Sequence, residues 1–440
     1  MSHFQMDFPP AEFELRRQRV FDAIGKQGVA VLAGGPATGA FDLFRQTNEF
    51  YYLCGVEVPH AYLRLDGSMR WTTLYLSRRD PKHEQSEGAQ LSSSDPAAVC
   101  KLTGVDDVKP LEALATDLTD AASLFTPMAP AEGREASRDT LLHAKHLRDA
   151  DPWDGRPSRE EHFRDKLATV CPQAEFHDLS PILDPLRLIK SHREIELMRR
   201  AGRLTAKAVV AAMQITRPGL FEFELAAEAD HLYLRSGAMG PGYRPIVASG
   251  ANIWNAHYYR NNGVLNEGEL VLMDYAPDVG CYTSDIGRMW PVNGTYSPVQ
   301  RELYGFVVEY HKVLLKGTIR PGVLTRDLAT EAAETIRPVW SAWPWSKPAY
   351  RDAALKMIDS EVAFTHPVGM CVHDVGSYKP DPLRPGLVFA LDPQLWVPDE
   401  QLYIRVEDTV VVTPDGAESL TKAAPLELDE IEQIVRKCST

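Results

Sequence analysis

The sequence predicts a two-domain α+β protein, with a smaller α/β domain over residues 1–185 and a larger domain over residues 186–440. Three observations lead to this prediction. A chain of 440 residues is too long for one ordinary hydrophobic core. Strand-like and helical patterns interleave over roughly the first 180 residues, which favours a compact α/β domain. A helix-start motif occurs twice in the second half, which indicates that a helix-and-strand unit is duplicated there.

The first domain opens with a helical pattern over residues 11–27, where apolar positions recur among charged neighbours. The apolar run Gly28–Leu32 predicts a buried strand. Further strands are predicted at Phe50–Cys54, Ala61–Leu65 and Trp71–Leu76, and further helices near 95–104, 110–121 and 158–170. The segment 128–160 is rich in Pro, Gly and charge, so we expect most of it to form a surface excursion.

The second domain is predicted to begin near Leu186, with the boundary at about residues 180–188. Ser191 and Glu194 form a capping box, which is a sequence signature of a helix start. Arg217-Pro-Gly and Arg320-Pro-Gly each follow one helical pattern and precede another. Duplication would build one sheet with two related halves and a cleft that gathers acidic residues from both. Chance similarity over so short a motif is the alternative.

Composition narrows the classes of function. A net charge of −14 argues against a nucleic-acid-binding surface, which would need a basic patch. The amino terminus has no signal-peptide pattern, and no apolar run approaches the length needed to span a bilayer. The six cysteines are scattered, without paired metal-ligand spacing or the density of a disulfide framework. These features predict a reduced, cytoplasmic protein that binds neither nucleic acid nor membrane.

The stretch Glu269–Trp290 carries the first chemical signal. An apolar run, a turn containing Pro277 and Gly280, and a second strand-like run over 282–290 predict a hairpin. Asp274 and Asp285 would then face each other across it. Like charges on a half-buried sheet repel, so a divalent metal between them is one explanation. A solvated face that carries both acids is the other.

The second repeat adds more candidates. His366 and His373 lie in a segment punctuated by glycines, which allow close backbone approach. Asp392 ends the apolar run that starts at Leu387 and is predicted to be a buried strand. Arg405 and Glu407 should share one face of another strand, because side chains alternate. A plain structural ion pair between them is the alternative.

Taken together, these motifs resemble the metallopeptidases of the "pita-bread" fold (the creatinase, aminopeptidase P and prolidase family), and among them the Xaa-Pro aminopeptidases. The stretch Phe44–Gly55 is similar to a signature of the family's N-terminal domain, an RNase H-like α/β domain, and Leu188–Ala201 is similar to the entry to its catalytic domain. The resemblance therefore implies a pita-bread catalytic domain with an internal pseudo-two-fold repeat, preceded by the smaller α/β domain.

The resemblance also implies a function and a site. The expected activity is hydrolysis of the bond between an N-terminal residue and a following proline, by a hydroxide that bridges two divalent metals. The implied metal ligands are Asp274, Asp285, His366, Asp392 and Glu407, and the implied catalytic residues are His257, His373 and Arg405. Mn²⁺ is the expected metal, with Zn²⁺, Co²⁺ and Fe²⁺ open, since oxygen ligands with one imidazole suit all four. A peptide substrate and a homodimer or homotetramer are expected as well.

Three positions depart from the family pattern. Asp392 stands where the family has glutamate, Val362 where it has a further histidine, and Gly287 where it has threonine. The shorter side chain of Asp392 predicts a weakened second metal, because its carboxylate reaches roughly 1.5 Å less far. A prolidase or other hydrolase of the same fold, and a binding protein with weakened catalysis, are the alternative functions.

Overall fold

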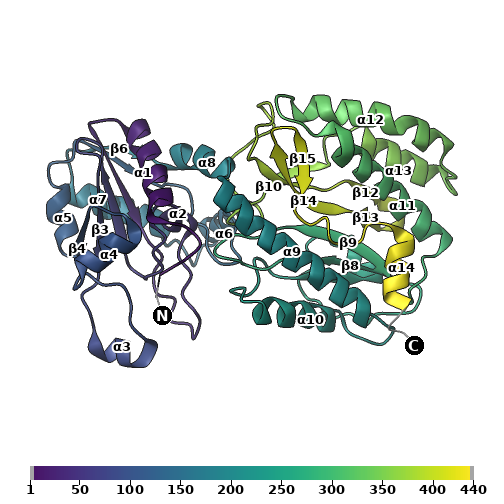
Figure 1. Ribbon diagram of the computed structural model, residues 1–440, viewed down its shortest axis with the longest axis horizontal. Coiled ribbons are helices and arrows are strands. Elements are labelled where there is room, and N and C mark those ends of the chain that lie inside the picture. The colour runs from purple at the N-terminus through teal and green to yellow at the C-terminus, as the bar shows by residue number, and fades with distance from the viewer. Residues whose placement is uncertain (1–3, 437–440) are drawn as a thin grey trace. The chain divides into compact units, whose positions relative to one another are not determined.

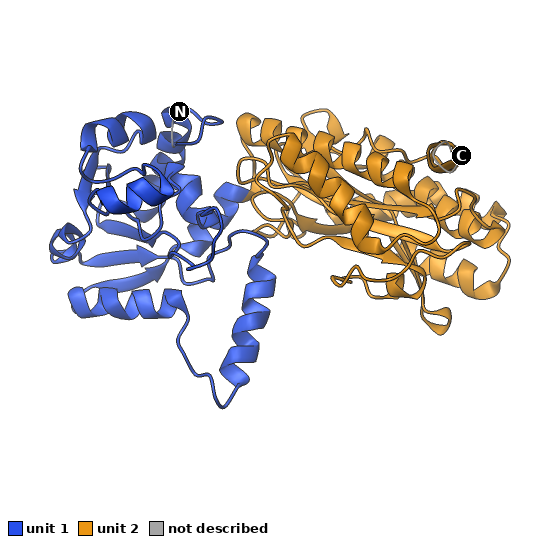
Figure 2. Cartoon of the chain, turned by 90° about the horizontal axis from the view of Figure 1, so that it is seen from below, with its two compact units in different colours: residues 1–187 blue, residues 188–440 orange. Residues whose placement is uncertain are grey.

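The computed structural model describes residues 4–436, and the chain forms two compact units, residues 1–187 and 188–440 (Figure 2). The first unit is built on a six-stranded sheet in the order β4-β3-β2-β1-β5-β6. Its strands are β1 (Gly28–Ala33), β2 (Tyr62–Asp66), β3 (Trp71–Leu76), β4 (Asp107–Pro110), β5 (Ser123–Thr126) and β6 (Glu175–Asp178). The strands β1, β2 and β3 pair antiparallel, whereas β4, β5 and β6 join in parallel.

The helices of this unit lie around the sheet, apart from α3, which stands away from it (Figure 1). They are α1 (Pro10–Ile24), α2 (Asn48–Cys54), α3 (Pro81–Glu87), α4 (Pro96–Thr103), α5 (Ala113–Leu118), α6 (Arg138–Ala150), α7 (Arg159–Val170) and α8 (Ser180–Leu188). Between the sheet and the helices, Val29 and Val31 of β1 pack with Leu118 and Leu167 in a buried apolar cluster. The predicted mixture of strands and helices is therefore confirmed for the first unit.

One prediction for this unit was wrong. The run Phe50–Cys54 is not a strand but most of helix α2, which Gly55 ends in the left-handed region at φ 68°. All seven residues of α2 are buried, so its apolar residues show no helical periodicity in the sequence. The expected excursion over 128–160 contains helix α6, none of whose residues is buried. This helix is exposed, as expected of a surface excursion, and its exposure accounts for the polarity of the segment.

The second unit contains a seven-stranded sheet with the path β10-β11-β14-β9-β8-β7, on which β15 also pairs with β14. Its strands are β7 (Ile246–Ser249), β8 (Leu270–Asp274), β9 (Ile286–Pro291), β10 (Phe364–Pro367), β11 (Val388–Leu391), β14 (Glu407–Thr413) and β15 (Gly416–Ser419). A separate ribbon pairs β12 (Gln394–Val397) with β13 (Leu402–Arg405). The helices are α9 (His192–Ile215), α10 (Glu222–Arg235), α11 (Pro298–Val313), α12 (Thr325–Ala342), α13 (Pro348–Ile358) and α14 (Leu428–Arg436).

The sheet has two halves, as the duplication predicted. Helices α9 and α10 precede β7, β8 and β9, while α11, α12 and α13 precede β10, β11 and β14 (Figure 1). The Pro-Gly turns at 218–219 and 321–322 lie before α10 and α12, and the Ser191 capping box opens α9. The halves meet where β14 pairs with β9, through Glu407 opposite Gly287 and Asp408 opposite Ile286. Residues from both halves of the sequence are therefore neighbours at this junction.

One strand boundary differs from its prediction. The strand expected over 282–290 begins only at Ile286, as β9. The backbone N–H of Thr283 donates to Gly369 O at 2.9 Å, and that of Asp285 donates to Thr409 Oγ1 at 2.6 Å. Both acceptors belong to the second half of the unit, so these hydrogen bonds draw residues 282–285 away from pairing with β8.

Candidate metal centre

Four carboxylates meet at the centre of the second unit because their strands are neighbours in the sheet. Asp274 ends β8, Asp285 precedes β9, Asp392 follows β11 and Glu407 starts β14. All four are buried, with exposed fractions of 5% or less. Like charges this close, without water, repel strongly, so positive charge is required among them.

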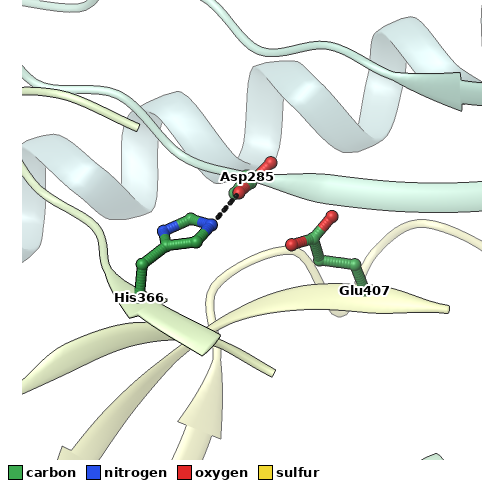
Figure 3. Close-up of side chains that lie close together, drawn as sticks. All are labelled: Asp285, His366 and Glu407. Carbon is green, nitrogen blue, oxygen red and sulfur yellow. Dashed lines mark ion pairs between the residues drawn. The ribbon is translucent and has the colours of Figure 1, made fainter. Parts of the chain in front are cut away.

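Three of the predicted ligands form a compact cluster (Figure 3). Asp285, His366 and Glu407 each offer one ligand atom, and these atoms all lie within 4.8 Å of one another. The Nε2 atom of His366 in β10 lies 3.6 Å from Asp285 Oδ2. The Oε1 atom of Glu407 is buried, and no group among residues 4–436 donates a hydrogen bond to it. A buried carboxylate oxygen without a partner, beside an imidazole and a second carboxylate, fits a divalent metal ion.

The pKa values in this cluster point the same way. Burial raises the pKa of Asp285 well above its ordinary value, and the nearby Asp274 raises it further. Burial likewise raises the pKa of Glu407 well above its ordinary value, against the opposing effect of Arg405. Both carboxyl groups thus lack enough positive charge among the protein's own side chains. A divalent cation would supply it.

The other two predicted ligands are held by Arg405 instead. Its Nη1 donates to Asp274 Oδ2 at 2.9 Å, while its Nε and Nη2 donate to Asp392 Oδ1 and Oδ2 at 3.1 and 2.9 Å. The Nη2 atom also contacts Glu407 Oε2. Burial lowers the pKa of Arg405, but Asp392 and Glu407 outweigh this effect and raise it well above its ordinary value. The guanidinium is therefore charged and surrounded by three carboxylates.

The two predicted catalytic histidines lie in a row with the predicted metal-binding one. The rings of His366 and His373 have centroids 4.0 Å apart, and those of His373 and His257 are 6.0 Å apart. His257 is exposed to solvent, whereas His373 is half-buried. The three rings therefore connect the cluster at His366 to a solvent-exposed histidine.

Two residues of the site were missed by the sequence reasoning. Tyr243 Oη lies 2.6 Å from Asp274 Oδ1 and 3.0 Å from Asp285 Oδ1, so one hydroxyl joins both aspartates. Gln394 Nε2 donates to Asp392 Oδ2. No motif pointed to Tyr243, which precedes β7, whereas Gln394 follows Asp392 by two residues and could have been suspected from alternation alone.

The two remaining departures from the family pattern occupy different settings. Val362 is 38% exposed and does not belong to the three-residue cluster. Gly287 lies opposite Glu407 in the sheet. A Cβ atom at position 287 would lie 3.0 Å from Glu407 Cβ and 3.2 Å from Arg405 Nε. The absent side chain therefore makes room for both neighbours.

Two family models match this chain, one described as "Metallopeptidase family M24" over residues 196–414 and one as "Aminopeptidase P, N-terminal domain" over residues 13–126. The Xaa-Pro aminopeptidase of Escherichia coli is 30% identical over 96% of this chain and 97% of its own. Xaa-Pro aminopeptidase 3 of Homo sapiens is 30% identical over 97% of this chain and 86% of its own. Among solved structures, E. coli aminopeptidase P with the inhibitor Pro-Leu is similar at a TM-score of 0.79 and 28% identity, over 98% of this chain and 99% of the other.

Proposed function

This chain belongs to metallopeptidase family M24, as its motifs predicted, and we propose that it is a metal-dependent exopeptidase that releases an N-terminal residue preceding proline. The predicted fold, a pita-bread domain preceded by an aminopeptidase P N-terminal domain, is confirmed by the same matches. The observation that carries the proposed activity is the buried cluster of Asp285, His366 and Glu407 beside the row of histidines. The relatives' names supply the substrate class, an Xaa-Pro peptide.

The cluster would hold the metal through two carboxylates and one neutral imidazole. A bound divalent ion polarises a carbonyl and activates water at neutral pH. His373 lies next to His366 and can donate a hydrogen bond to the negative charge that develops on the scissile carbonyl. His257, at the exposed end of the row, would donate a second hydrogen bond to the same developing charge. Arg405 holds Asp274 and Asp392 in place on the other side.

Several finer assignments belong to this proposal. Mn²⁺ is the proposed metal, and Zn²⁺, Co²⁺ and Fe²⁺ are alternatives with the same preference for oxygen and imidazole ligands. A homodimer or homotetramer, a cytoplasmic location and a domain boundary between residues 185 and 186 also stay predictions. Among residues 4–436, no helix is long and apolar enough to cross a membrane. The predicted second ion, at Asp274 and Asp392, has less support, because Arg405 already contacts their oxygens.

The test is hydrolysis before and after metal removal. Protein treated with a chelator and then dialysed should not cleave Xaa-Pro peptides, and added Mn²⁺, Co²⁺ or Zn²⁺ should restore cleavage. Matched Xaa-Ala peptides report the specificity for proline, and Xaa-Pro dipeptides beside longer peptides distinguish a prolidase from an aminopeptidase. Undiminished cleavage by rigorously metal-free protein would refute the proposed mechanism.

A further inference from the structure

The four central carboxylates differ in which of their oxygens are already engaged. Both oxygens of Asp274 accept hydrogen bonds, Oδ1 from Tyr243 and Oδ2 from Arg405. Both oxygens of Asp392 accept from Arg405, and Oδ2 also accepts from Gln394. Glu407 Oε2 contacts Arg405, whereas its Oε1 is buried and accepts no hydrogen bond from the part of the chain that the structure describes. Within residues 4–436, the carboxylate oxygen that still lacks a donor therefore belongs to Glu407, and not to Asp274 or Asp392.

The guanidinium of Arg405 forms a bidentate interaction with the carboxylate of Asp392. Two nitrogens donate to the two carboxylate oxygens at 3.1 and 2.9 Å, and the third donates to Asp274 at 2.9 Å. Paired, charge-assisted hydrogen bonds of this kind are strong, and both partners are buried. An additional divalent ion between Asp274 and Asp392 would lie beside a like charge, from which water does not screen it.

The guanidinium of Arg405 can take this position because residue 287 is a glycine without a side chain. The nearest neighbours of a Cβ atom at 287 would be Glu407 Cβ at 3.0 Å, Arg405 Nε at 3.2 Å and Arg405 Cγ at 3.4 Å. Any larger residue would press on the stem and the head of the Arg405 side chain. Two of the three positions that depart from the family pattern therefore bear on the same arginine: Asp392 contacts Arg405, and a side chain at 287 would press on it.

We propose that this chain binds a single divalent ion, at Asp285, His366 and Glu407, and that the guanidinium of Arg405 stands in place of a second ion between Asp274 and Asp392. The inference rests on the proposed function, since it concerns the same metal centre. It changes the expected composition of that centre from two ions to one ion and one fixed organic cation.

The test is metal stoichiometry, measured by equilibrium dialysis against Mn²⁺ and elemental analysis. The natural protein should bind one ion per chain, with the electron paramagnetic resonance signal of an isolated Mn²⁺. Asp285→Asn should weaken binding more than 100-fold, because a ligand is lost. Asp392→Asn should still bind one ion, within about tenfold of the natural affinity, because it acts only through Arg405. Asp278→Asn, a buried aspartate outside the cluster, is the matched control and should bind one ion unchanged.

Arg405→Met should open the second position and raise the stoichiometry toward two. Should that variant fail to fold, the natural protein and Asp392→Asn decide the question. Two ions per chain with an exchange-coupled signal, or an Asp392→Asn variant that loses its ion as Asp285→Asn does, would overturn the inference. Two ions with metal-dependent cleavage would leave the proposed function intact, whereas no bound ion with full cleavage would overturn both.

Discussion

Replacing Gly287 with alanine should destabilise the second unit, because the new methyl group would clash with its buried neighbours. It would lie 3.0 Å from Glu407 Cβ and 3.2 Å from Arg405 Nε, closer than ordinary carbon contacts of about 3.5–4.0 Å. Both neighbours are buried and held by ion pairs, so they yield only at a cost. Overpacking typically costs about 1–3 kcal/mol. Alanine also lowers the conformational entropy of the unfolded chain, which stabilises the folded state by about 0.4–1 kcal/mol.

The net loss is then on the order of 0.5–2 kcal/mol. At about 2–4 °C per kcal/mol, the melting temperature of the metal-free protein should fall by about 1–8 °C. Gly305→Ala is the control, because its Cβ would lie 3.5 Å from the Trp343 ring, an ordinary contact, inside helix α11. Alanine there should be neutral or stabilising by up to about 1 kcal/mol. Circular dichroism melts compare the two, and a Gly287→Ala protein that melts at or above the natural temperature would refute the packing argument.

Three further predictions follow from the structure. His257→Ala and His373→Ala should each lower kcat by about 10²–10³ without loss of bound metal, because each removes a transition-state donor and no ligand; kinetics beside elemental analysis checks this. Asp392→Glu should introduce a second bound Mn²⁺ in calorimetric titration, which the natural protein lacks, because the added methylene extends the carboxylate past the Arg405 guanidinium; an unchanged stoichiometry of one ion would contradict this. Burial, with the neighbouring Glu132, raises the pKa of Glu49 to about 8, so the folded protein holds a proton that the unfolded chain releases near pH 4.5. That contribution to stability is complete below the unfolded pKa and is lost as pH rises through about 8, and urea titrations should show that Glu49→Gln flattens this decline.

Much of the second unit could be predicted because its signals are local. The Ser191 capping box and the two Pro-Gly turns lie where helices begin, since a helix start depends on the few residues around it. Asp274 and Asp285 do come together, although they share the Tyr243 hydroxyl rather than facing each other along a hairpin. They meet because the strands β8 and β9, next to which they lie, pair in the sheet. The exact strand limits were set by hydrogen bonds to distant segments.

What could not be predicted depends on side chains brought together by the sheet. Alternation placed Arg405 and Glu407 on one face, and the two do contact each other. The stronger engagement of Arg405 is with Asp392 and Asp274, whose positions depend on pairing between β8, β9, β14 and β11. The misassigned helix α2 has the same cause, because burial on all sides hides its periodicity. Neither feature leaves a trace in residue spacing.

Because β9 pairs with β14, the residues of the proposed metal site come from both halves of the second unit. Asp285 comes from the first half, whereas His366 and Glu407 come from the second. Arg288 of β9 also links the two strands. Its Nη1 donates to Glu407 O at 2.6 Å, and its Nη2 donates to Asp408 Oδ1 at 2.8 Å. A fragment that ends before α11 would therefore carry one aspartate of the cluster and no partner for it. Two separately expressed fragments would have to pair β9 with β14 again to regain the centre, so recovery of metal binding would report their reassembly.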